Sequence, residues 1–207
     1  GRAWQIFLAN TQNAYELSRV GNKSVLFAPS DIPLAKKEHI DDFVTNCMHQ
    51  DNIVKNDVYY CIIKNKSTTV EYPGHIRGGY KLSEGSFRPA NLVLVKPSGI
   101  KNPDIFAKAF IGTRKLSNIA SKLKLAHYVG YAKTFNHIIK YLRGTAKISD
   151  VEDAIGDAMG ARLKLVETKY AELEYDIDDS NDNYELKRRL ESSIVQKYAK
   201  KPSSSLF

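Results

Sequence analysis

Apolar residues follow different spacings in different parts of the chain. Between residues 34 and 50 they recur three, four, seven and eight positions apart, which is the spacing of one helical face. Short runs of branched and aromatic residues predict strands instead. These runs are residues 25–28, 58–64 (VYYCIIK), 68–72 and 91–96 (NLVLVK). We expect the second and third runs to form a hairpin and all of them to contribute to one antiparallel sheet.

Proline divides the chain into two halves. Six of the seven prolines precede residue 104, and the seventh is Pro202. Because proline interrupts helices, a long stretch without it favours continuous helix. We therefore predict an α+β protein, with a mixed α/β N-terminal half that holds a small antiparallel sheet and an all-helical C-terminal half. The corresponding domains are residues 1–103 and 104–201, followed by a tail, 202–207.

A basic block, residues 105–149, contains nine lysines and arginines and no aspartate or glutamate. If one helix runs through it, four of its lysines form a row, because their separations are near multiples of about 3.6. Like charges at helical spacing repel one another unless an external anion neutralises them. We expect the row and three neighbouring cations to contact nucleic-acid phosphates, although a merely solvated face is the alternative. These residues are Lys115, Lys122, Lys133 and Lys140, with Arg114, Lys124 and Arg143.

The segment 72–89 (YPGHIRGGYKLSEGSFRP) is a glycine-rich loop with interleaved aromatic and basic side chains. Glycine lets the backbone approach a ligand closely, and aromatic residues beside arginine stack on exposed bases. We expect nucleic-acid contacts here from Arg77, Tyr80, Lys81, Phe87 and Arg88. The alternative is a long hairpin connection whose aromatic residues pack locally, since its glycines do not have the spacing of a phosphate-binding loop.

An acidic segment, residues 170–186, follows the basic block and offsets part of its positive charge, which leaves the chain with a net charge of +8. We expect it to contact another subunit or the basic block of the same chain. The residues concerned are Glu172, Glu174, Asp176, Asp178, Asp179 and Asp182. The start of this run resembles a calcium loop, but Asn181 and Lys187 occupy the glycine and glutamate positions of that motif. We therefore predict no metal site. Upstream, Ser149 and Glu152 have the spacing of a helical capping box.

Catalytic and cofactor motifs are scarce. The five histidines are scattered, and only His75 with Arg77 suggests a reaction, namely phosphodiester cleavage. Cys47 and Cys61 have no CxxC neighbour, so we expect buried free thiols. We expect no cofactor.

The balance of charge and motifs favours a non-enzymatic structural or assembly protein with a basic helical face on nucleic acid. A nucleocapsid-like or virion-associated subunit of a virus or phage is an example. The alternatives are a monomeric nucleic-acid-binding protein and the phosphodiester-cleaving enzyme. Expected partners are nucleic acid and copies of the chain or other subunits. The chain has no apolar run long enough to span a membrane and no recognisable secretion signal, so we expect a location inside the cell or a viral particle.

Overall fold

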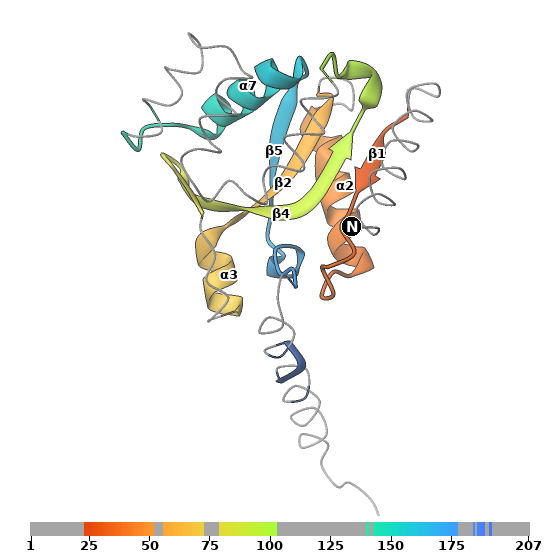
Figure 1. Ribbon diagram of the computed structural model, residues 1–207, viewed down its shortest axis with the longest axis vertical. Helices are drawn as coiled ribbons and strands as arrows, with labels where there is room; N and C mark the ends of the chain where they lie inside the picture. The colour runs from red at the N-terminus through yellow and green to blue at the C-terminus, as the bar shows by residue number, and fades with distance from the viewer. Residues whose placement is uncertain are drawn as a thin grey trace, which may run out of the picture.

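A computed structural model describes residues 23–51, 56–72, 79–102, 140, 143–177, 184, 186–188 and 191 (Figure 1). Its strands form a five-stranded mixed sheet of order β1-β4-β2-β5, with β3 also paired to β4. The strands are β1 (Val25–Phe27), β2 (Val58–Lys64), β3 (Tyr80–Leu82), β4 (Gly85–Val95) and β5 (Leu163–Thr168). The helices are α2 (Lys37–Asp51), α3 (Asn65–Glu71) and α7 (Ile148–Met159), with the 3-10 turns η1 (Pro97–Gly99) and η3 (Ala171–Leu173).

Four strands of the sheet run in one direction. The strands β1, β2 and β3 are each antiparallel to β4, and β5 is parallel to β2. The strands β1, β2 and β5 therefore end on the same side of the sheet, which we call the carboxyl edge. In Figure 1, α3 and η3 follow β2 and β5 along this lower edge.

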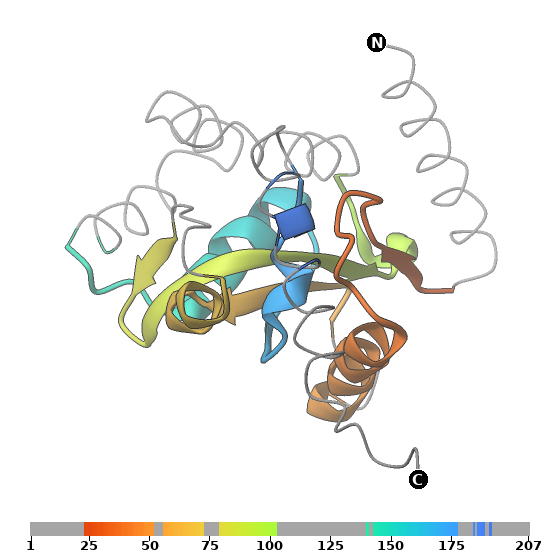
Figure 2. The same ribbon diagram turned by 90° about the horizontal axis from the view of Figure 1, so that it is seen from below.

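Helices cover both faces of the sheet. Cys61 and Ile63 of β2 pack in one core cluster with Phe43 of α2. Val58 of the same strand packs in a second cluster with Met159 of α7. This alternation follows from the two-residue period of a strand, which sends successive side chains to opposite faces. Figure 2 shows the result, with α7 on one face of the sheet and α2 on the other.

The prediction of buried free thiols is confirmed for both cysteines. Burial raises the pKa of Cys47 to about 12 and the pKa of Cys61 well above its ordinary value. Because the thiolate is the reactive form, we expect both residues to react with a thiol reagent more slowly in the native protein than in denaturant, by roughly a thousandfold for Cys47. Stopped-flow labelling at pH 8 measures this ratio, and fast labelling without denaturant would contradict it.

The predicted all-helical C-terminal half is wrong, because β5 lies within it and joins the sheet beside β2. Helix α7 ends at Gly160, whose φ of 59° is the left-handed conformation that closes helices. After Ala161 and Arg162, the residues LKLVET form a strand. A lack of proline permits a helix without requiring one. The sheet is accordingly mixed rather than antiparallel. The helices predicted for residues 104–142 lie outside the described residues except at residue 140, and the domain boundaries stay a prediction.

The strand predicted at residues 68–72 is also wrong, because these residues fall largely in α3. The hydroxyl groups of Thr68 and Thr69 donate hydrogen bonds to the carbonyl oxygen of Asn65, at 3.0 and 2.9 Å. Threonine can adopt a helical rotamer when its hydroxyl binds the preceding turn in this way. The antiparallel partner of β2 is instead β4, and the β3–β4 hairpin occupies part of the predicted loop 72–89.

Helix α7 starts one residue before the predicted capping box. The carboxylate of Asp150, rather than that of Glu152, accepts a hydrogen bond from the Lys147 backbone amide, at 2.9 Å. Glu152 instead accepts one from the amide of Leu165 in β5, at 2.8 Å. The predicted glutamate therefore joins α7 to the sheet and does not cap the helix.

An ion pair between Asp57 and Arg162 connects the amino ends of β2 and β5. The Asp57 carboxylate accepts hydrogen bonds from the Arg162 backbone amide, Nε and Nη2, at 2.9, 3.1 and 3.2 Å. Burial by itself raises the pKa of the Asp57 carboxyl. The Arg162 hydrogen bonds and the charges of Arg162 and Lys96 outweigh burial, and the pKa lies below its ordinary value.

Protonation of Asp57 is expected to weaken the fold in acid. Because the folded-state pKa is lowered, the contribution is complete above about pH 4 and is lost as the pH falls through the folded-state value. Asp57→Asn should therefore cost about 1–3 kcal/mol at pH 7 and less at acid pH. Urea denaturation of both proteins across this range measures the difference, and a difference independent of pH would contradict the assignment.

Candidate functional site

The carboxyl edge brings together polar residues that are far apart in the sequence. They come from the segment after β1, from α3, from β4 and from the segment after β5. These residues are Asp31, Thr68, Arg88, Asn91, Glu174 and Asp176. In open α/β sheets, ligands bind outside the carboxyl ends of the strands. This edge is therefore the candidate functional site.

A backbone contact joins the two acidic segments of the site. The amide of Ile177 donates a hydrogen bond to the carbonyl oxygen of Asp31, at 3.0 Å. Asp31 follows β1 and is half-buried, whereas Asp176 follows η3 and is 9% exposed. The hydrogen bond therefore brings the backbone of one aspartate next to the segment that carries the other.

Asn91 lies at an irregular point of β4. Its φ is 44°, and it is the single non-glycine residue with positive φ in the described part of the chain. The pairing of β2 with β4 jumps there, from Tyr60 opposite Val93 to Ile62 opposite Pro89. The side-chain amide of Asn91 donates a long hydrogen bond, 3.4 Å, to the carbonyl oxygen of Glu174. Bulges and left-handed residues are frequent beside functional sites, where they redirect a side chain.

A buried ion pair lies next to this irregularity. Nη1 of Arg88 is 3.5 Å from Oε1 of Glu174, and the two side chains are 3% and 4% exposed. The same nitrogen donates a hydrogen bond to the hydroxyl of Thr68, at 3.2 Å. Buried charges require such partners, since the loss of hydration is otherwise costly. The pair connects β4 to the segment after β5 inside the protein.

Two aromatic rings extend the site toward α2. The rings of His39 and Tyr170 stack with centroids 4.3 Å apart. Nζ of Lys169 lies 5.1 Å from the centroid of the Tyr170 ring, which is within the range of a cation–π contact. These contacts fix the turn that directly follows β5.

Metal ligands are limited in this part of the chain. The described residues contain no group of three or more His, Cys, Asp or Glu side chains that is able to hold a metal ion. Magnesium is nevertheless often bound by one or two carboxylates together with substrate phosphates and water. Asp31 and Asp176 are two carboxylates that the edge carries on adjoining segments.

Comparison with known proteins gives one informative similarity. No protein-family model matches the chain, and no curated protein matches it. A solved structure described as a hypothetical transferase from Thermus thermophilus is similar, with a TM-score of 0.64 and 25% sequence identity. The similarity covers 84% of this chain and 68% of the other. It points to an enzyme.

This similarity overturns the function predicted from the sequence. The expectation of a non-enzymatic structural protein, such as a viral or phage assembly subunit that binds nucleic acid, is wrong, because the similar structure is described as a hypothetical transferase and so points to an enzyme. The partners named above stay predictions. In the described part of the chain, no helix has the length and apolar character needed to cross a membrane, as expected.

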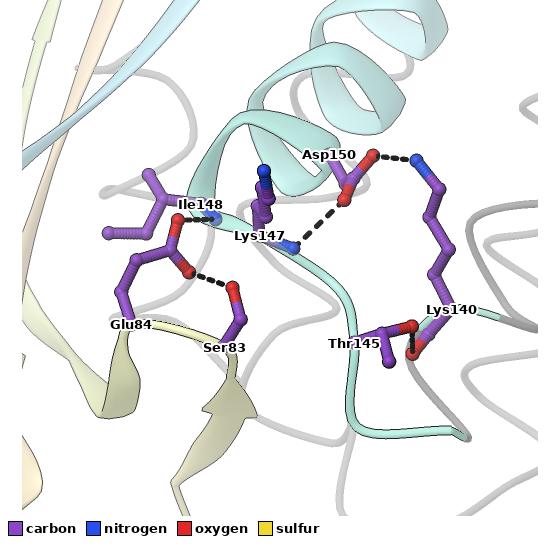
Figure 3. Close-up of polar contacts among 7 residues, drawn as sticks. All are labelled: Ser83, Glu84, Lys140, Thr145, Lys147, Ile148 and Asp150. Atoms are coloured by element: carbon purple, nitrogen blue, oxygen red, sulfur yellow. Dashed lines mark hydrogen bonds and ion pairs between the residues drawn. The ribbon is translucent and has the colours of Figure 1, made fainter.

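Most of the predicted basic row lies outside the described residues. This applies to Lys115, Lys122, Lys133, Arg114, Lys124 and Arg77, and also to His75 and the acidic residues Asp178, Asp179 and Asp182. Lys140 is described, and its Nζ lies 2.5 Å from Oδ1 of Asp150 (Figure 3). At the same junction, the carboxylate of Glu84 accepts a hydrogen bond from the Ile148 amide, at 3.1 Å. Lys140 is thus neutralised within the chain, by an acid outside the predicted acidic segment.

The remaining predicted residues divide into exposed and buried groups. Tyr80, Lys81 and Arg143 are exposed, and Glu172 is half-buried. Phe87 is buried in a core cluster with Leu82, which agrees with the local-packing alternative for its loop. Arg88, Glu174 and Asp176 are buried as well, so their surroundings differ from the exposed surfaces for which they were proposed.

Three residues of the site were missed in the sequence, namely Asp31, Thr68 and Asn91. A signal existed for Asp31, because it closely follows the predicted strand 25–28, and polar residues after strands form sites in α/β sheets. Asp176 carries the same signal once residues 163–168 are recognised as a strand. Asn91 lies inside a predicted strand, and its left-handed conformation has no signal in a single sequence.

A shallow groove lies at the opposite side of the sheet. Its volume is about 370 Å³, and Asn56, Arg162 and Lys164 line it together with the acidic residues Glu152, Asp153 and Asp157. It lies at the amino ends of β2 and β5, where the strand-end rule does not place ligands. The carboxyl edge therefore stays the preferred site.

Proposed function

We propose that the protein is a transferase whose substrates bind at the carboxyl edge of the sheet. The observation that carries the proposal is the similarity to the hypothetical transferase at 25% identity over 84% of this chain. The local geometry supports it, because the edge holds Asp31 and Asp176 on adjoining segments beside the irregular residue Asn91. One or two carboxylates at such an edge suit a divalent cation shared with a phosphate-bearing donor.

A donor screen tests the proposal. Nucleoside triphosphates, nucleotide sugars, S-adenosylmethionine and acyl-CoA represent the main donor classes, and each is added with and without Mg²⁺. A donor at about 100 times its Kd adds about 2.7 kcal/mol of stability, which raises Tm by about 5–10 °C in a protein of this size. Mass spectrometry of candidate acceptors then follows transfer from the donor that binds.

Variants at the edge locate the site. Asp31→Asn and Asp176→Asn should each remove most of the donor-induced rise in Tm, because each loses a carboxylate of the edge. The matched control is Asp41→Asn, since Asp41 is exposed on α2 and pairs with Lys37 of the same helix. Absence of stabilisation by every donor class would contradict the transferase proposal. Equal stabilisation of all three variants would place the site elsewhere.

A further inference from the structure

The segment that carries Asp176 is buried although it is irregular. After η3, Glu174, Tyr175 and Asp176 are 4%, 1% and 9% exposed. The ring of Tyr175 lies 5.0 Å from the ring of Tyr72, which follows α3. A segment of this kind lacks the repeated hydrogen bonds of a helix or strand, so individual side-chain contacts decide where it lies.

Polar contacts, in addition to this ring contact, hold the segment against the rest of the site. The Arg88 guanidinium meets the Glu174 carboxylate at 3.5 Å, and the Asn91 amide reaches the Glu174 carbonyl at 3.4 Å. The Ile177 amide reaches the Asp31 carbonyl at 3.0 Å. The first two contacts start from β4 and the third from the segment after β1. Together they hold Glu174 and Ile177, the residues on either side of Tyr175 and Asp176.

The ion pair between Arg88 and Glu174 is unusual because both charged side chains are buried. Charges buried to this extent lose their hydration, and apolar residues of similar volume often replace a buried pair with equal or greater stability. The pair is therefore poorly explained as a source of stability. A charged pair does have one property that an apolar pair lacks, since it requires a defined geometry between its partners.

We propose that Arg88 and Glu174 form a positioning pair, which fixes residues 174–177 so that Asp176 stays in register with Asp31. Asn91 supports the pair by holding the Glu174 backbone. The importance of this position of Asp176 for substrate binding rests on the proposed function. The positioning by Arg88 and Glu174 does not depend on that function. Neither Arg88 nor Glu174 is required to touch the substrate, because both are buried below the edge.

Hydrogen exchange of the Ile177 amide tests the positioning directly and needs no substrate. In the double variant Arg88→Met/Glu174→Leu, exchange at Ile177 should become roughly tenfold faster or more, while the amides of β2 keep their protection. The Tm of the double variant should stay near that of the native protein. A matched control is Lys64→Met/Glu167→Leu, which removes a half-exposed pair between β2 and β5 with a separation of 3.0 Å. The control should leave exchange at Ile177 unchanged.

A second variant acts on the backbone contact alone. Asn91→Gly keeps a residue that tolerates positive φ and removes the amide that binds the Glu174 carbonyl. It should also accelerate exchange at Ile177. Native exchange at Ile177 in both variants would overturn the proposal. A double variant that fails to fold would overturn it too, since the pair would then be needed for stability.

Donor binding separates this inference from the proposed function. If the native protein binds a donor, the double variant should bind it roughly tenfold more weakly or worse, whereas the Lys64/Glu167 control should bind it normally. A native protein that binds no donor contradicts the transferase proposal, and the exchange result still decides the positioning. Tight donor binding by a double variant whose Ile177 amide is unprotected would show that the register does not matter for the substrate.

Discussion

An Arg88→Met variant is expected to lose about 3–5 kcal/mol of unfolding free energy near neutral pH. The substitution keeps most of the side-chain volume but removes the positive charge that contacts Glu174 inside the protein. Glu174 is 4% exposed, so water does not replace the lost partner. Equilibrium denaturation measures the loss. The matched surface variant, Lys64→Met, should change stability by less than about 1 kcal/mol, because Lys64 and Glu167 are both well exposed.

The pH dependence of this loss provides a sharper test. Without the arginine charge, burial favours the neutral form of Glu174, so the folded state of the variant binds a proton more readily than the unfolded state. The penalty is therefore smallest below about pH 4, where the carboxyl is protonated in both states, and it grows as the pH rises. A loss of equal size at every pH would show that packing, rather than charge, explains the effect.

A Gly99→Ala variant is expected to lose about 3 kcal/mol or more. A Cβ atom at Gly99 would lie 2.0 Å from Oδ1 and 2.3 Å from Cγ of Asp57. The Asp57 carboxylate cannot move aside freely, because three hydrogen bonds from Arg162 hold it. The variant therefore combines overpacking with the loss of charge-assisted hydrogen bonds.

The matched control for this steric effect is Gly144→Ala. Gly144 has a φ of 68°, and no atom lies within 4 Å of the Cβ position there. Its substitution should cost only about 1–2 kcal/mol, the strain of a left-handed alanine. Thermal or chemical denaturation compares the two variants. If Gly144→Ala proved the more harmful, backbone conformation rather than the Asp57 contact would dominate.

The sequence predicts individual helices and strands of this fold better than it predicts which strands pair with each other. The run VYYCIIK coincides with β2, and the helical spacing of residues 34–50 corresponds to α2. The prediction failed at β5, because a proline-free stretch was taken as helical although residues 163–168 include the strand-favouring Val166 and Thr168. It failed at α3 because threonine favours strands in general, while here two threonine hydroxyls bind the backbone of the preceding turn.

The candidate site was less accessible to sequence reasoning, for a physical reason. Arg88 and Glu174 are charged, and an isolated charged residue is usually at the surface. Their burial depends on meeting each other, and that meeting depends on the direction in which β4 and β5 run. Asp31 and residues 174–177 follow β1 and β5, which lie at opposite ends of the strand order, and it is the segments after these strands that meet. Such sites become visible only when the topology of the sheet is known.

The parallel pairing of β2 with β5 has a consequence for synthesis of the chain. The ion pair beside it links residues 105 positions apart, and the strands themselves are equally distant in the sequence. During translation β2 therefore leaves the ribosome long before β5 is synthesised. Until then, the edge of β2 that pairs with β5 has no partner strand. A nascent chain halted before Leu163 would present VYYCIIK as an open strand edge, the kind of surface that chaperones cover and that otherwise aggregates.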